Sequence, residues 1–323
     1  MPKRAYVVLG LGSIGLRHAR NLLALGRTVV GFDPDDARCA RLVEGGGLIV
    51  KNRDDALACA AKGHAILIAT PSAAHREDLL DVLPLASPVF VEKPMATRLD
   101  DIGKALAQAR APVLLGHNQR FNPAVAKARA LLSSGRLGAP LWARAICASY
   151  MPHWRPGQDY RLGYAADPYS GGVIFDIIHE LDLLYHLLGP FETIGAWARR
   201  SGTIEIAAED IADIVLRHAS ALQSTIHLDY VTRPAIRTTE ITCARGRITI
   251  DVQRRAVRAE DTSGAALLEH VAPGTVDDDY CRLIEHFVAC AEDGAEPACP
   301  ASEGFAVLTE TIRARRMAGL PQA

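Results

Sequence analysis

The sequence predicts an α/β protein, in which a doubly wound parallel sheet is followed by an α+β domain with a large, mostly antiparallel sheet. The first third of the chain alternates short, nearly all-apolar runs with helical patterns, which is typical of parallel strands covered on both faces. A glycine-rich turn follows the first apolar run, and after residue 122 alternating strand patterns predominate. We therefore expect one domain at 1–120 and a second at 121–323, with a C-terminal helix that can pack back on the first.

The predicted elements follow from these patterns. Strands of the first domain are expected at 5–9, 28–32, 48–50, 65–69, 88–91 and 112–115, with helices at 14–25, 73–82 and 99–109. The second domain is expected to contain a helix at 124–132, a strand at 141–149, an irregular stretch at 150–171 and an apolar helix at 174–188. Strands are then expected at 224–230, 239–242 and 247–252, and helices at 279–291 and 303–317.

Composition excludes several classes of partner. With 36 basic and 37 acidic residues the net charge is −1, so neither nucleic acid nor an anionic membrane is expected to bind. No apolar run approaches the roughly 20 residues of a bilayer span, and the N-terminus enters a strand pattern without a signal-peptide pattern. The seven cysteines form no C-x-x-C pair, which argues against a disulfide framework or a zinc site. A cytoplasmic location is expected.

A glycine motif lies between the first predicted strand and helix. Gly10-Leu11-Gly12-Ser13-Ile14-Gly15 has the G-x-G-x-x-G spacing that lets a backbone approach a pyrophosphate at a helix N-terminus. The second strand ends at Asp33, where a carboxylate can bind an adenosine ribose. We therefore predict a Rossmann domain that binds NAD; Arg38 leaves NADP possible, and a glycine turn without a ligand is the alternative.

Polar clusters follow three of the predicted parallel strands, at 69–72, 92–94 and 116–123. The carboxyl ends of such strands share one edge of the sheet, so these clusters should line one crevice with the cofactor. Lys93 could there hydrogen-bond a substrate hydroxyl and help to move its proton, although a solvated lysine at a turn is the alternative. The residues expected near the cofactor from these clusters and the helix after the first of them are Ala69, Thr70, Pro71, His75, Glu92, Lys93 and Asn118.

Four segments, GLGSIGLRHARNL, ATPSAAH, VEKPMA and GHNQRFNP, resemble in order and spacing the Gfo/Idh/MocA oxidoreductase family. The resemblance covers essentially the whole chain, and E-K-P is its most specific part. It implies that Lys93 lies in an active site, and that the lysine–proline peptide is often cis. It also implies a homodimer or homotetramer formed through the C-terminal sheet, with Tyr230, Arg233 and Arg237 as interface or structural residues.

The predicted helix at 174–188 contains four polar residues among apolar ones. Asp176, His179 and Glu180 share one helical face by their spacing, and Asp182 lies three residues beyond His179. A histidine between carboxylates can act as a general base near neutral pH, although a satisfied core histidine is the alternative. The resemblance implies an Asp…His pair that joins the lysine, but many relatives space it by four residues, so His179 is the firmer assignment. No metal is predicted.

The aromatic stretch at 150–169 is expected to line the substrate side. Aromatic faces with arginine and aspartate suit a sugar or cyclitol, although a covering or dimer-contact loop is the alternative. The predicted substrate contacts are Lys93, Asn118, Arg120, Trp154, Arg155, Tyr160, Arg161, Asp176 and His179. Asn118 and Arg120 could instead cap the following helix.

The sequence thus predicts hydride transfer between a secondary alcohol of a sugar-like substrate and nicotinamide. His179 would remove the hydroxyl proton, Lys93 would polarise the oxygen, and Asp176 would orient both. Two other functions remain. In one, NAD oxidises the substrate transiently during elimination or epimerisation and is regenerated in each cycle. In the other, the chain is a non-catalytic dinucleotide-binding sensor or assembly subunit.

Overall fold

The computed structural model describes residues 4–154 and 157–322. The chain forms two compact units. Unit 1 comprises the residues up to 117 together with 280–305, and unit 2 comprises 118–279 together with the residues from 306 onward. The predicted fold class, a doubly wound α/β sheet plus an α+β part, is confirmed. The predicted boundary at residue 120 stays a prediction.

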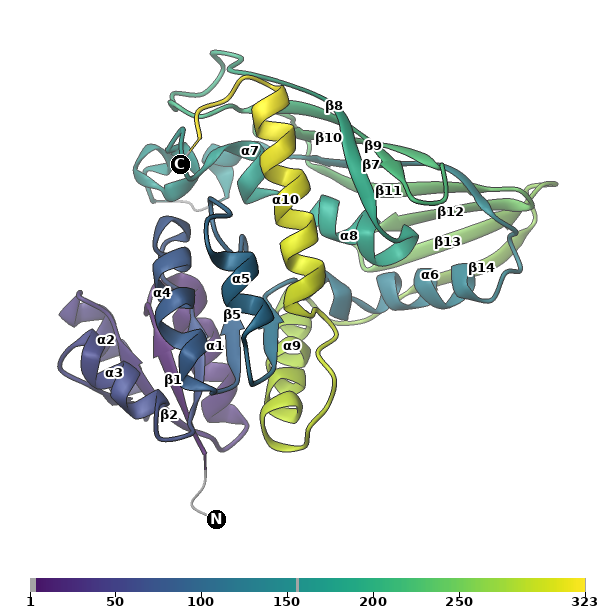
Figure 1. Ribbon diagram of the computed structural model, residues 1–323. Helices are drawn as coiled ribbons and strands as arrows, with labels where there is room; N and C mark the ends of the chain where they lie inside the picture. The colour runs from purple at the N-terminus through teal and green to yellow at the C-terminus, as the bar shows by residue number, and fades with distance from the viewer. Residues whose placement is uncertain (1–3, 155–156, 323) are drawn as a thin grey trace. The chain divides into compact units, whose positions relative to one another are not determined.

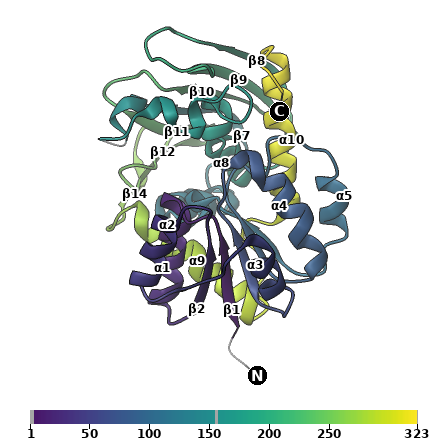
Figure 2. The same cartoon turned by 90° about the vertical axis from the view of Figure 1, so that its left-hand side faces the viewer.

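Unit 1 is built on a six-stranded parallel sheet with the order β3-β2-β1-β4-β5-β6. Its strands are β1 (Ala5–Leu9), β2 (Thr28–Phe32), β3 (Leu48–Ile49), β4 (Ala65–Ile68), β5 (Val89–Val91) and β6 (Val113–Leu115). Helices cover both faces, as α1 (Ser13–Ala24) and α4 (His75–Val82) show on opposite sides in Figure 2. β1, β4 and β5 are buried along their whole length, as expected for strands covered on both sides.

Three further helices belong to unit 1: α2 (Asp36–Glu44), α3 (Arg53–Ala60) and α5 (Ile102–Ala107). The sequence patterns did not predict α2 and α3. Both begin at side-chain caps, because Asp35 accepts hydrogen bonds from two backbone N–H groups of α2 and Asn52 from one of α3. Most of α9 (Val276–Glu292) also lies in this unit.

Unit 2 contains an eight-stranded sheet with the order β14-β13-β12-β11-β7-β10-β9-β8. Its strands are β7 (Pro140–Ala148), β8 (Phe191–Arg199), β9 (Ile211–His218), β10 (Gln223–Asp229), β11 (Ile236–Cys243), β12 (Gly246–Asp251), β13 (Ala256–Asp261) and β14 (Ala266–Val271). Only β7 and β10 pair in parallel; the other neighbours are antiparallel. Along β9 and β10 buried residues alternate with more exposed ones, so one face of the sheet packs on the core.

The helices of unit 2 pack on the buried face of this sheet (Figure 1). They are α6 (Pro123–Ser133), α7 (Gly172–Asp176), α8 (His179–Leu188) and most of α10 (Ala301–Met317). The prediction of one continuous helix at 174–188 is wrong. The backbone leaves the helical region at Ile177 (φ −101°, ψ 33°), so Asp176 ends one helix and His179 begins another.

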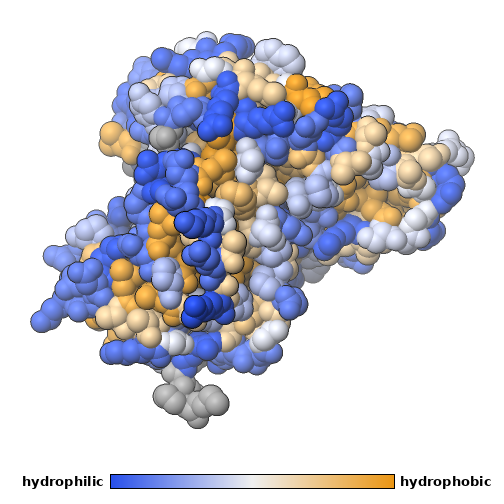
Figure 3. All heavy atoms as spheres, viewed as in Figure 1, coloured by the Kyte–Doolittle hydropathy of each residue, from blue (hydrophilic) through white to orange (hydrophobic). Residues whose placement is uncertain are grey.

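Within the described residues, no helix is long and apolar enough to cross a bilayer. Hydrophilic side chains predominate over α2 and α3, at the lower left of Figure 3. The apolar core of unit 2 lies between its sheet and α6, α7 and α8.

Candidate active site

The glycine loop has the geometry that a dinucleotide requires. Gly10 has a φ of +85°, and a Cβ on Gly15 would meet the carbonyl of Gly10, so only glycine fits at these two positions. A Cβ on Gly12, by contrast, would meet nothing within 4 Å. The loop therefore packs closely against its own turn but leaves open space at Gly12, directly before the N-terminus of α1. This arrangement fits a pyrophosphate group.

Asp33 follows β2 and is held by the same loop. Its Oδ2 accepts a hydrogen bond from the Leu11 N–H at 2.7 Å, and its Oδ1 accepts one from the Asp35 N–H at 2.9 Å. The half-exposed guanidinium of Arg38 lies 3.4 Å from Oδ2. A carboxylate has about four acceptor positions, so Asp33 retains the capacity to bind the hydroxyls of a ribose.

The tips of β4 and β5 are joined by His75. Its ring nitrogens lie 2.7 Å from the Pro94 carbonyl oxygen and 2.8 Å from the Thr70 carbonyl oxygen. Lys93, half-buried, directly follows the buried Glu92, and the Lys93–Pro94 peptide is cis, as the resemblance led us to expect. Because β4, β5 and β6 are parallel neighbours, the polar clusters after them lie at the same edge of the sheet.

Asp176 accepts hydrogen bonds from two tyrosine hydroxyls of unit 2. Tyr164 donates a hydrogen bond to Oδ1, and Tyr230 donates one to Oδ2 at 3.2 Å. Burial, followed by the charge of Asp176, raises the pKa of Tyr230 well above its usual value, so this hydroxyl stays protonated and donates. Tyr230 has no exposed surface, so of the two expected roles, interface or structural, it has the structural one: it is a core residue that supports Asp176.

The other polar residues of this segment point to separate partners. The buried Asp182 receives two hydrogen bonds from Arg120, at 2.6 and 3.0 Å. The buried Glu180 receives two hydrogen bonds from Arg237, at 2.8 and 3.2 Å. His179, 8% exposed, begins α8. The expectation that Asp176, His179 and Glu180 share one helical face is wrong, because the break at Ile177 separates the first from the other two.

Arg120 and Asn118 lie in a short 3-10 turn, 118–121, ahead of α6. Neither caps that helix, because Asn122 does so by accepting a hydrogen bond from the Ala124 N–H. Both side chains are buried.

Of the predicted aromatic loop, Trp154 and Tyr160 are ordered against unit 2. The Trp154 indole N–H donates to the Ser149 hydroxyl at 2.9 Å, and its ring lies edge-on to Tyr230. The Tyr160 hydroxyl accepts a hydrogen bond from the Glu205 N–H at 3.2 Å. Arg161 is exposed and forms ion pairs with Asp159 and Glu205. Arg155 lies outside the described residues.

The start of α7 is fixed by a buried ion pair. Arg315 of α10 lies 3.0 Å from the Glu209 carboxylate and donates to the carbonyl oxygens of Gly171 and Pro168 at 3.1 and 2.8 Å. Gly172, with a φ of +82°, packs so tightly against Glu209 that a Cβ would overlap the carboxylate. This cluster sets the direction of the short helix that ends at Asp176.

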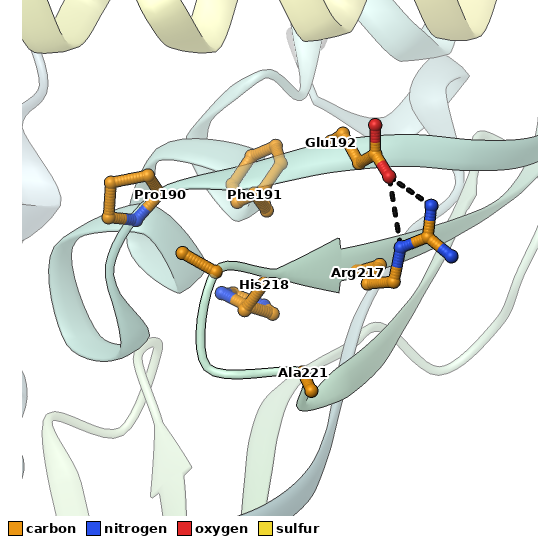
Figure 4. A pocket seen from close by; sticks show the side chains of 7 residues that line it. Pro190, Phe191, Glu192, Arg217, His218 and Ala221 are labelled. Carbon is orange, nitrogen blue, oxygen red and sulfur yellow. Dashed lines mark hydrogen bonds and ion pairs between the residues drawn. The ribbon is translucent and has the colours of Figure 1, made fainter.

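A hollow of about 490 Å³ opens elsewhere in unit 2, between the start of β8 and the β9–β10 turn (Figure 4). Its lining residues include Phe191, His218 and the Glu192–Arg217 ion pair. None of the predicted site residues lines it. Among the described residues, no cluster of three or more potential metal ligands occurs.

Sequence reasoning missed four residues that the structure brings to these sites: His18, Tyr164, Glu209 and Arg315. Tyr164 belongs to the aromatic stretch at 150–169, so the aromatic composition of that stretch could have indicated it. The contacts of His18 and Arg315 span 74 and 106 residues of sequence, and no local pattern announces them.

The fold and the glycine loop define an oxidoreductase with a dinucleotide-binding domain, and sequence comparison identifies the family. Residues 4–114 match the family described as "Oxidoreductase family, NAD-binding Rossmann fold", and residues 125–249 match the "GFO/IDH/MocA C-terminal domain". The chain belongs to the Gfo/Idh/MocA family of oxidoreductases.

Individual relatives cover most of the chain. It is 27% identical to the inositol 2-dehydrogenase of Rhizobium meliloti (strain 1021), over 93% of this chain and 92% of that protein. It is 28% identical to the 2,7-anhydro-N-acetylneuraminate hydratase of Escherichia coli (strain K12), over 78% of this chain and 68% of that protein. A solved oxidoreductase from Agrobacterium radiobacter, in complex with NAD+, L-tartaric acid and magnesium, shares the fold with a TM-score of 0.83 at 20% identity, covering 98% and 96% of the two chains.

Proposed function

We propose that this protein is an NAD-dependent dehydrogenase that acts on a secondary alcohol of a sugar, cyclitol or sugar nucleotide. The observation that carries the proposal is the position of Lys93. It stands directly after β5, at the same edge of the parallel sheet as the glycine loop after β1. Ligands of doubly wound sheets bind at this edge. A lysine there is suited to bind a substrate oxygen.

The residues of unit 1 suit NAD better than NADP. The proposed cofactor-binding set from unit 1 comprises Gly10, Gly12, Ser13, Ile14, Gly15, Asp33, Arg38, Ala69, Thr70, Pro71, His75, Glu92 and Lys93; Asn118, the first residue of unit 2, completes the proposed set. The buried carboxylate of Asp33 would repel a 2′-phosphate. The guanidinium of Arg38 pairs with the Asp33 carboxylate, so the positive charge of Arg38 is directed at Asp33 and not at a 2′-phosphate. NAD, when bound, supplies the hydride acceptor of the reaction.

The chain's own residues handle the proton. His179 accepts the proton of the substrate hydroxyl as general base. Lys93 donates a hydrogen bond to the same oxygen and stabilises the charge that develops there. Asp176 orients these groups. Its two tyrosine donors fix the direction of its carboxylate.

The proposed substrate is a polyol-like molecule. Trp154 and Tyr160 offer aromatic faces to C–H surfaces, and Arg120, Arg155 and Arg161 offer donors to hydroxyls. The name of the Rhizobium relative, inositol 2-dehydrogenase, supports a polyol. We also propose assembly into a homodimer or homotetramer through the open face of the C-terminal sheet, which bears the exposed Trp142 and Trp197. Seven free cysteines suit a reducing compartment, in keeping with a cytoplasmic enzyme.

A second candidate is a reaction without net oxidation. The E. coli relative is named a hydratase, and adding or removing water changes no net oxidation state. The same lysine and histidine could then serve transient oxidation of the substrate, with the cofactor regenerated in every cycle.

The test is a panel of cyclitols, free sugars, anhydrosugars and sugar nucleotides, incubated with purified protein and NAD. Nicotinamide absorbance and chromatographic product analysis are measured on the same samples. Net dehydrogenation gives NADH and an oxidised product in equal amounts. Product without NADH would establish the redox-neutral reaction. Intact NAD binding with neither signal across the panel would favour the non-catalytic sensor.

A further inference from the structure

Helix α1 carries a histidine that contacts the carboxylate beside Lys93. His18 lies on α1, the helix that begins at the glycine loop, and its Nε2 is 2.7 Å from Glu92 Oε1. The other oxygen of Glu92, Oε2, accepts a hydrogen bond from the backbone N–H of Lys93 at 3.1 Å. A chain of two hydrogen bonds thus runs from the dinucleotide-binding helix to the backbone of the lysine.

Both members of this pair are buried. His18 has no exposed surface, and its ring packs edge-on against Phe90 at 4.9 Å and Tyr280 at 5.9 Å between ring centroids. Gly116 closes the carboxylate side, because a Cβ there would lie 2.8 Å from Glu92 Oε1. The carboxylate therefore cannot move without disturbing α1 or the segment after β6.

Charge gives the pair a second property. Burial alone would raise the pKa of Glu92, but the hydrogen bond from His18, the charges of His18 and Lys93 and the Lys93 N–H lower it below its usual value. Glu92 is therefore an anion in the neutral range. His18 Nδ1 has no hydrogen-bond partner among the described residues, so Glu92 is the polar partner that fixes this ring.

Two further groups lie beside the pair among the described residues. The titratable Tyr280 of α9 contacts the His18 ring, and the guanidinium carbon of Arg17 of α1 lies 4.8 Å from the centre of the Tyr280 ring. The ammonium of Lys93 is the nearest cationic group in sequence to the Glu92 carboxylate and contributes to balancing its charge.

We propose that His18 and Glu92 are positioning residues for Lys93, which hold its backbone to α1 and keep its side chain an ammonium ion. Lys93 then acts as a hydrogen-bond donor to the substrate oxygen, and the removal of the proton falls to His179. The consequence for catalysis rests on the proposed dehydrogenase function, but the effect on the charge of Lys93 does not. In this role Glu92 affects the substrate only through Lys93.

The charge of Lys93 can be measured without a substrate. Acetic anhydride acetylates only neutral amines, so the pH at which labelling of Lys93 is half-maximal, followed by mass spectrometry, gives its pKa. In Glu92→Gln, which keeps the shape and removes the charge, this midpoint should fall by about one pH unit. The exposed Lys104 and Lys127 are internal controls and should not change. An unchanged midpoint for Lys93 would overturn the proposal, whatever the substrate is.

Position is tested separately from charge. Gly116→Ala adds a methyl group against Glu92 without changing any charge, and should lower kcat/KM by about tenfold while the Kd for NADH stays within about twofold. Tyr6→Phe is the control, because it removes another side-chain hydrogen bond of unit 1, the partly buried one from Tyr6 to Glu292 at 2.7 Å. If Tyr6→Phe lowers kcat/KM as much as Gly116→Ala, or if Gly116→Ala leaves it unchanged, the positioning role is wrong. If Glu92→Gln does not fold, the acetylation midpoint of Lys93 in the wild-type protein decides the electrostatic part. A midpoint below those of Lys104 and Lys127 would overturn it, because an adjacent anion should hold the lysine charged at least as well as solvent does.

Discussion

Replacing Arg315 by methionine tests how the start of α7 is held. The guanidinium is 1% exposed, pairs with Glu209 at 3.0 Å, donates to the carbonyl oxygens of Gly171, Pro168 and Pro321, and lies 4.4 Å from the centre of the Phe175 ring. Methionine fills much of the volume but leaves the Glu209 carboxylate buried without its counter-charge. Breaking a buried pair in this way costs about 3–5 kcal/mol.

The pH dependence of this loss has a definite sign. Burial already raises the pKa of Glu209 above its usual value, although the charge of Arg315 opposes the shift. Without the arginine the pKa rises further, so the buried acid can become neutral at low pH. The destabilisation caused by Arg315→Met should therefore be smaller near pH 5 than near pH 8. It should grow as the pH rises from the pKa of Glu209 in the unfolded chain to the higher pKa of Glu209 in the folded variant.

Denaturant unfolding followed by tryptophan fluorescence is the assay, because all three tryptophans, Trp142, Trp154 and Trp197, lie in unit 2. The double variant Arg315→Met/Glu209→Gln removes both charges and should recover at least about half of the loss. A single variant within about 1 kcal/mol of the wild type would refute the reasoning, as would a double variant no more stable than the single.

Three further outcomes follow from the contacts described above. His227 lies 2.8 Å from Asp213 and 3.1 Å from Asp229. Burial lowers the pKa of His227, but the hydrogen bonds to the two aspartates and their charges outweigh burial, so its pKa is raised. Its contribution to stability is thus present below its ordinary pKa of about 6.5 and is lost as the pH rises through the folded value. His227→Gln should cost more at about pH 5.5 than at pH 8.5, though less than about 1 kcal/mol at this exposed site, and equal costs at both pH values would contradict this. Asp33→Asn should raise the Kd for NAD roughly tenfold relative to that for NADP, measured by fluorescence titration; an unchanged ratio would mean that Asp33 does not select the cofactor. Tyr230→Phe removes the 3.2 Å hydrogen bond to Asp176 and should lower the unfolding free energy by about 1–2 kcal/mol, whereas a neutral effect would show that Asp176 does not depend on it.

The arrangement of unit 1 could be predicted because it depends on local patterns. Nearly all-apolar strands such as Ala65–Ile68 indicate burial on both faces, and the glycine spacing at 10–15 restricts the turn that follows β1. The helices at 36–44 and 53–60 were missed although Asp35 and Asn52 offered cap signals. The hydrophobic pattern at 53–60 is weak, and the helix at 36–44 is short and buries only Cys39 and Leu42.

The break between α7 and α8 could not be read from the sequence. Val173 to Ile178 is apolar except at Asp176, and such a run predicts an uninterrupted helix. The partners of Asp176 lie 12 and 54 residues away in sequence, so the contacts that accompany the break are tertiary. For the same reason the spacing of three between Asp176 and His179 gave a misleading picture of a shared face.

The proposed chemistry is tested most directly by Lys93→Met, assayed with the substrate that the panel identifies and with NADH binding measured on the same preparation. If Lys93 polarises the substrate oxygen, turnover should fall by roughly a thousandfold or more while the Kd for NADH changes by less than about threefold. Turnover within about tenfold of the wild type, with binding intact, would contradict the central role of this lysine.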